Sequence, residues 1–224
     1  MTLLLPRRPS ADDAATRRTG RLQVYRDDGP ICAALGRLAQ GQLPPLPGAV
    51  VAAFVTAVLA VTGLGAQHSL ALFAPVAALL LTGPAATHPH DGPLDWLVPP
   101  LIRAIEYGYL AVLGFAAGVP EPLIYVLIAV LAYHHYDTVY RTRQRLSPPA
   151  WIFRAGLGWD GRMLIVAAAG LAGVLPFAYA ALAAYLGVLF GVESVRTWTQ
   201  TGHGTGVVVD LEEESPEEEE EARS

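Results

Sequence analysis

The sequence is poor in charged residues and contains one cysteine and no lysine. Only 16% of its 224 residues are charged, whereas 53% are hydrophobic and the mean hydropathy is +0.38. This balance is typical of a membrane protein rather than a soluble domain. Cys32 has no partner for an intrachain disulfide and no zinc-knuckle spacing around it, so we expect a solvent-facing or lightly buried thiol. All 15 basic residues are arginine, a bias from which we draw no function.

Apolar runs predict an all-α, polytopic membrane helix bundle with about six transmembrane helices. The runs cover residues 48–66, 69–83, 96–118, 121–140, 162–176 and 177–196. The second and fifth runs are shorter than the ~20 residues of a full span, which favours tilted or kinked helices. We therefore divide the chain into a disordered leader (1–25), an amphipathic interfacial segment (26–47), the bundle (48–197) and an acidic disordered tail (198–224).

The interfacial segment is expected to contain a membrane-surface helix over residues 31–43. Its approximate apolar side carries Ile31, Leu35, Leu38 and Leu43, and the prolines that follow turn the chain towards the membrane.

Arginines predict the orientation of the bundle. They gather in the N-terminal segment and in the loop between the fourth and fifth runs. The positive-inside rule then predicts cytoplasmic N and C termini in the inner (cytoplasmic) membrane of the cell, with several passes.

The stretch Tyr133 to Arg141, which reads YHHYDTVYR, is the strongest candidate for a functional site. On a helix, His134, Asp137 and Arg141 are three and four residues apart and share a face. His135 points elsewhere and is expected to be a packed or interfacial histidine. Ionisable groups at membrane depth indicate a functional site by default, although structural pairing is the alternative.

Other unusual polar residues are predicted to lie at the same cytoplasmic end. They are Asp91, Asp95, Arg103, Glu106, Asp160 and Arg162. Each has a structural alternative. Arg103 and Glu106 are three apart and can neutralise one another, Asp160 can cap the fifth helix, and the segment HPHD can be a solvated loop.

Carboxylates and arginines at one membrane surface suit a phosphorylated substrate. We expect Asp91, Asp95 and Asp137 to hold Mg²⁺. Arg103, Arg141 and Arg162, with Asp160, are the candidate substrate-binding residues. His134, Asp137 and Glu106 are the candidate catalytic residues, with His134 or Glu106 as general base.

Several motifs along the chain carry a family resemblance. They are YRDDGP (25–30), GQLPPLP (41–47), HPHDG (88–92), DWLVP (95–99), EYG (106–108), the Tyr133 to Arg141 stretch and GLGWDGR (156–162). Over residues 25–197 the chain resembles an uncharacterised actinobacterial membrane domain, some members of which are joined to nucleotidyltransferase and CDP-alcohol phosphotransferase modules. The resemblance implies a setting in phospholipid metabolism and a partner of one of these two kinds.

The chain is only superficially similar to the CDP-alcohol phosphotransferases themselves. Their signature D-G-x-x-A-R…G-x-x-x-D-x-x-x-D is broken here, because Asp91-Gly92 is followed by Pro93-Leu94-Asp95-Trp96 and no later D-x-x-x-D occurs. That departure removes most of the support for their chemistry.

Three functional hypotheses follow. In the first, a cytoplasmic-facing polar pocket acts on a lipid-linked or nucleotide-activated, phosphate-bearing substrate by phosphoryl or phospho-alcohol transfer or by hydrolysis. In the second, the chain is a non-catalytic anchor or scaffold for a phospholipid-biosynthesis partner. A small transporter is a weaker third, because its polar groups should lie near the bilayer midplane. The lipid bilayer is an expected partner in each case, and nucleic acid is not.

Overall fold

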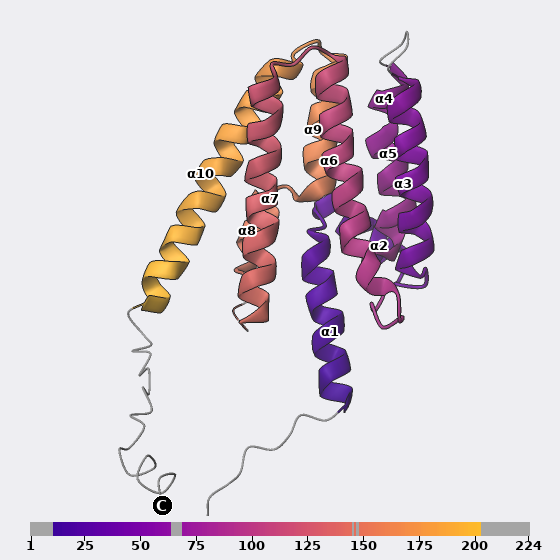
Figure 1. Cartoon of the computed structure of the whole chain (residues 1–224). Helices are drawn as coiled ribbons and strands as arrows, with labels where there is room; N and C mark the ends of the chain where they lie inside the picture. Colours follow the sequence, from indigo (N-terminus) through magenta and orange to yellow (C-terminus); the bar gives the residue numbers. More distant parts are fainter. Residues whose placement is uncertain (1–10, 64–68, 145, 147, 203–224) are drawn as a thin grey trace, which may run out of the picture. The chain divides into compact units, whose positions relative to one another are not determined.

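The part of the chain that the computed structural model describes consists of helices joined by turns and short loops (Figure 1). It comprises residues 11–63, 69–144, 146 and 148–202, and within these ranges there is no β-strand. In chain order the elements are α1 (Ala11–Arg26), α2 (Pro30–Leu38), α3 (Pro45–Thr62), α4 (Ser69–Leu72), α5 (Ala74–Thr82), the 3₁₀ turns η1 (Gly83–Ala85) and η2 (Asp95–Leu97), α6 (Val98–Ala116), α7 (Glu121–Arg143), α8 (Ala150–Ala155), α9 (Gly158–Leu171) and α10 (Leu175–Gly202). The all-α prediction is confirmed.

The chain forms two compact units, Met1–Gly191 and Val192–Ser224. In the described part of the second unit, the last turns of α10, the Thr197 hydroxyl donates a hydrogen bond to Glu193 Oε1 at 3.0 Å. The packing described below belongs to the first unit.

Three helical stretches in the described residues are long and apolar enough to span a membrane: Pro45–Thr62, Asp95–Ala116 and Leu175–Thr199. Large apolar side chains cover their outer surfaces, with Phe54 70% exposed and Phe177 74% exposed. An exposed apolar surface of this kind is what a lipid-facing helix presents. Six spans and their orientation remain predictions, because α7 ends in a polar segment and α9 has 14 residues.

A helix lies within the segment that we predicted as the leader. Helix α1 occupies residues 11–26, most of the expected disordered leader, while residues 1–10 and most of the acidic tail lie outside the described residues. Helix α2 ends at Leu38 rather than continuing to residue 43, because Gln40 and Gly41 adopt positive φ angles of 53° and 66°.

The face that α2 buries also differs from the expected one. Cys32 and Gly36 are buried, while Ile31 and Leu38 are exposed. The expectation of an accessible thiol was therefore wrong. Burial raises the pKa of the Cys32 thiol far above its usual range.

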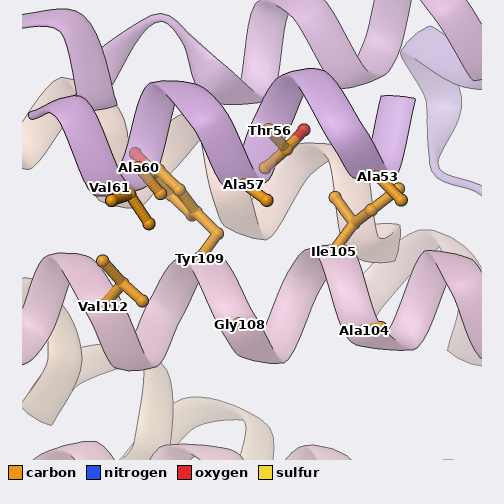
Figure 2. Close-up of a pocket in the computed structure, with 10 residues that line it drawn as sticks. All are labelled: Ala53, Thr56, Ala57, Ala60, Val61, Ala104, Ile105, Gly108, Tyr109 and Val112. Carbon is orange, nitrogen blue, oxygen red and sulfur yellow. The ribbon is translucent and has the colours of Figure 1, made fainter. Parts of the chain in front are cut away.

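Small residues bring α3 and α6 together. Figure 2 shows Ala53, Ala57 and Ala60 of α3 opposite α6, with the Tyr109 side chain crossing towards α3. Small side chains let two helix backbones approach closely, as membrane helices commonly do. A cavity of about 240 Å³ remains between the two helices.

Helix α10 is tied to the bundle by tyrosine hydroxyls. Tyr179 is buried and donates to the Leu110 carbonyl of α6 at 2.6 Å. Tyr185 donates to the Ala155 carbonyl at the end of α8 at 2.9 Å. These bonds fix α10 against two other helices.

Two tight turns that are far apart in sequence contact each other. The turn between α1 and α2 contacts the turn that begins α9, where Trp159 N–H donates to the Asp27 carbonyl at 3.1 Å. Gly158 has a φ of +63°, and a Cβ built on it would lie 2.2 Å from the Gly29 nitrogen. Only glycine satisfies both the backbone angle and the close approach.

We predict that Gly158→Ala lowers the free energy of unfolding by about 2–4 kcal/mol, because it adds backbone strain and a backbone clash. Unfolding in detergent micelles, followed by circular dichroism, measures the change. Gly191→Ala is the control, since this helical glycine has no atom within 4 Å of a built Cβ. Equal unfolding midpoints for the two variants would contradict the close contact between Gly158 and Gly29.

Candidate functional site

The buried carboxylate of Asp27 is the centre of the polar core. Asp27 follows α1 directly and has a φ of 53°, a left-handed conformation that aspartate tolerates better than most residues. Its side chain is 2% exposed and its Oδ2 accepts a hydrogen bond from Arg162 Nη2 at 2.7 Å. The turn thus carries an acidic side chain from the N-terminal segment into the bundle.

Two arginines and a glutamate complete an ion network with Asp27. Arg162 Nε donates to Glu106 Oε1 at 2.7 Å, and Arg103 Nη1 donates to Glu106 Oε2 at 2.6 Å. Arg103 Nη1 is also 3.9 Å from Asp27 Oδ2. We call Asp27, Arg103, Glu106 and Arg162 the ion network. Its two carboxylates and two guanidinium groups balance, as buried charges require.

Two backbone carbonyls accept further hydrogen bonds from the guanidinium groups of the network. Arg162 Nη1 donates to the Gly156 carbonyl at 2.9 Å, and Arg103 Nη2 donates to the Arg26 carbonyl. Through these bonds the network joins α6 and α9 to the end of α1 and to the turn before α9.

His134 and His135 of α7 both reach Asp27. His134 Nε2 is 3.7 Å from Oδ1, and His135 Nε2 is 3.1 Å from Oδ2. The His134 ring also stacks on Phe190, with centroids 3.8 Å apart and planes at 9°. Tyr107 OH contacts His135 Nδ1.

The surroundings keep Asp27 ionised. Burial alone would raise the pKa of its carboxyl group, but the Arg162 guanidinium lowers it, and the net effect is a pKa well below the usual range. Asp27 is therefore a carboxylate at neutral pH.

A second polar cluster stabilises the turn between α1 and α2. Arg26 is fully buried and donates from Nε to Asp28 Oδ2 at 2.6 Å, while Trp159 Nε1 donates to Asp28 Oδ1 at 2.9 Å. Asp160 accepts from the backbone N–H groups of Gly29 at 2.6 Å and Cys32 at 3.0 Å. Its carboxylate therefore caps the N-terminus of α2. Such a cap is normally made by the side chain of the residue that begins the same helix.

The structure brings together only some of the predicted site residues. Arg103, Glu106 and Arg162 meet in the ion network, and His134 joins them through Asp27. Asp160, a predicted substrate ligand with a capping alternative, is a cap, but of α2 rather than of its own helix. Arg103 and Glu106 are bonded as the pairing alternative predicted.

Asp137 and Arg141 form a separate buried pair. Arg141 Nε donates to Asp137 Oδ2 at 2.7 Å, the contact expected for residues four apart on α7. His134 shares their buried face but turns to Asp27.

The carboxylates predicted to hold Mg²⁺ do not form a common site in the described part of the chain. Asp91 is exposed, and the Asp95 side chain accepts from Gly92 N–H at 2.9 Å within its own turn. Neither belongs with Asp137 to a group of potential metal ligands there.

Sequence reasoning missed Asp27, the central residue of the candidate site, and set His135 aside. The DDGP segment stood out only for its family resemblance, since it belongs to no periodic run. A polar turn followed by proline at a helix start is a usable signal, but it does not reveal which distant helices the aspartate contacts.

Beside the ion network lies a cavity of about 350 Å³, which we call the α1/α6/α7 cavity. Its walls combine apolar groups with two arginines and a histidine. They include Leu22, Trp96, Pro99, Arg103, His135 and Arg143. Arg103 and His135 are thus shared by the cavity and the buried polar core.

We predict that Arg162→Ala lowers the free energy of unfolding by about 3–5 kcal/mol, because it leaves Asp27 and Glu106 buried without their shared partner. Unfolding in mixed micelles, followed by circular dichroism, measures it. Arg154→Ala is the control, since Arg154 is exposed on α8 and its loss should change stability by less than about 1 kcal/mol. Similar losses in both variants would contradict a structural role for the network.

Comparison with known proteins places the chain in a family without assigning an activity. No curated protein and no solved structure matches it. The model of the family described as "Family of unknown function (DUF5941)" matches residues 15–215, which include every residue of the ion network. The chain therefore belongs to this uncharacterised family, DUF5941.

Proposed function

We propose that this chain is a multi-pass protein of the inner (cytoplasmic) membrane that binds a phosphate-bearing lipid or lipid head-group precursor in the α1/α6/α7 cavity. The observation that carries the proposal is the composition of the cavity wall. Apolar residues such as Leu22 and Pro99 suit an acyl or isoprenoid chain, while Arg103 and Arg143 supply guanidinium groups that bind phosphate oxygens.

The two arginines of the cavity play different parts. Arg103 is held by Glu106 and by the Arg26 carbonyl, so its position is fixed before a ligand arrives. Arg143 is exposed near the end of α7 and lies outside the ion network. A fixed and an adaptable cation together suit a head group that enters from the membrane surface.

The apolar cavity between α3 and α6 is a poorer candidate. The cavity between α3 and α6 in Figure 2 is lined by small and apolar residues with Thr56 and Tyr109, and its lining contains no charged side chain. It offers space for hydrocarbon but nothing that selects a phosphate.

Catalysis of phosphoryl or phospho-alcohol transfer, or of hydrolysis, is the chemistry we propose for the bound ligand. Glu106 is not suited to act as its base, since two guanidinium groups stabilise the carboxylate form. The support for turnover is therefore the pairing of His134 and His135 with Asp27 next to the cavity, rather than the carboxylates of α6 and α7.

A scaffold role is the second candidate, and one observation favours it. Glu106, Asp137 and Asp160, three of the acids predicted to act on a substrate, are each bonded to arginine or to backbone N–H groups. In this proposal the network holds the bundle rigid and the chain anchors a nucleotidyltransferase or CDP-alcohol phosphotransferase partner.

We predict that the purified protein binds phosphatidate more tightly than diacylglycerol, which has the same chains but no phosphate. Arg143→Ala should weaken phosphatidate binding about tenfold, the value of one charge-assisted hydrogen bond. Native mass spectrometry from detergent measures both affinities, and Arg154→Ala should bind as the unaltered protein does. Equal binding of the two lipids would contradict the proposal.

A complementation experiment separates binding from scaffolding. If the cavity binds the physiological ligand, deleting the gene should change the phospholipid profile, and a copy carrying Arg143→Ala should fail to restore it. If the chain is only a scaffold, the same variant should restore the profile fully, because Arg143 is exposed and outside the network. Lipid mass spectrometry of the strains is the measurement, with equal protein levels checked by immunoblot.

A further inference from the structure

Asp27, His134 and His135 offer ligand atoms at metal-binding distances from one another. One carboxylate oxygen and one ring nitrogen from each histidine all lie within 4.8 Å of one another. We propose that these residues bind a divalent first-row transition metal ion such as Zn²⁺, with Asp27 Oδ1 and the Nε2 atoms of both histidines as ligands.

The strongest support is an unpartnered oxygen. Asp27 Oδ1 is buried and has no hydrogen-bond partner among the residues that the structure describes. Buried carboxylate oxygens are normally bonded, because leaving one without a partner is unfavourable. The ring nitrogen His134 Nε2 lies 3.7 Å away. Bonds of about 2.0–2.1 Å in tetrahedral geometry separate two ligand atoms by ~3.4 Å, so this pair of ligand atoms needs little movement to bind one ion.

The hydrogen bonds of His135 lead to the same conclusion. Arg103 Nη1 lies 2.7 Å from His135 Nε2, and a guanidinium can only donate, so Nε2 carries a lone pair. That lone pair also faces Asp27 Oδ2 at 3.1 Å, which brings two acceptors together. A cation near both atoms converts this unfavourable contact into a favourable one.

Neighbouring residues hold two of the ligands in place. With its lone pair on Nε2, His135 carries its proton on Nδ1 and donates it to the Tyr107 oxygen. A metal-binding histidine typically donates its other N–H in this way. Arg162 fixes the Asp27 carboxylate through Oδ2 and leaves Oδ1 available. Arg103 must give up its bond to His135, but it keeps Glu106 as an acceptor for the same nitrogen.

The ligand types select the class of ion. Two imidazoles and one carboxylate suit Zn²⁺, Fe²⁺, Co²⁺ or Mn²⁺, whereas Mg²⁺ prefers oxygen ligands throughout. The inferred ion therefore differs in kind and in position from the Mg²⁺ predicted at Asp91, Asp95 and Asp137. Three protein ligands leave a coordination position open. The inference does not depend on the proposed lipid ligand.

The test uses the full chain in detergent, treated with a chelator and then titrated with Co²⁺ or Zn²⁺. We expect one equivalent of bound metal by elemental analysis and, for Co²⁺, a visible d–d spectrum typical of nitrogen and oxygen ligands. His134→Phe keeps an aromatic ring to stack on Phe190 but removes the ligand, and should lower the affinity at least tenfold. Asp27→Asn should do the same.

His88→Gln is the matched control, because His88 lies outside the group and contacts the Gly41 carbonyl. It should keep the full affinity. Circular dichroism and gel filtration check that each variant is folded, and if Asp27→Asn is not, His134→Phe decides. The inference is overturned if the unaltered protein takes up no stoichiometric metal, or if folded His134→Phe and His88→Gln bind it equally well. Neither result would bear on phosphatidate binding, which is measured separately.

Discussion

The contact between Asp27 and Arg162 is the interaction on which the polar core depends. It joins a turn near the N-terminus to a helix more than a hundred residues later, and Arg162 carries the connection on to Glu106 of α6. Buried charges are unfavourable unless each is paired and hydrogen-bonded. The four members of the ion network meet this condition with equal numbers of acidic and basic groups, so the bundle can hold them away from water.

The need to pair these buried charges also explains the close backbone contacts between the turns around the network. Asp27 can enter the bundle only because its own backbone is left-handed and because Gly158 allows the two turns to touch. Trp159 of α9 then donates a hydrogen bond to Asp28, and the next residue, Asp160, caps α2. Two consecutive residues of α9 therefore hold the turn between α1 and α2 and the start of α2 in place. The turn between α1 and α2 and the start of α9 are therefore held together by contacts within the protein, without a ligand.

Sequence periodicity was sufficient for the helices but not for the site. Apolar runs predicted the α-helical class and the approximate positions of α3, α6, α7 and α10, because burial and lipid contact impose a local pattern. The spacing of Arg103 and Glu106 predicted their bond for the same reason. Asp27 and His135 were missed, since their importance arises from contacts over 108 residues of separation, which no local pattern encodes. Adjacent histidines point to different helix faces, and only the position of the turn shows that both reach one carboxylate.

A double-mutant cycle between Asp27 and Arg162 tests the central claim most directly. Asp27→Asn and Arg162→Gln, made singly and together, give the coupling in the free energy of unfolding between the two side chains. We predict a coupling of at least about 1 kcal/mol, with the double variant more stable than the sum of the single losses implies, because each single change removes the closest partner that the other buried charge has in this pair. Additive losses would contradict it.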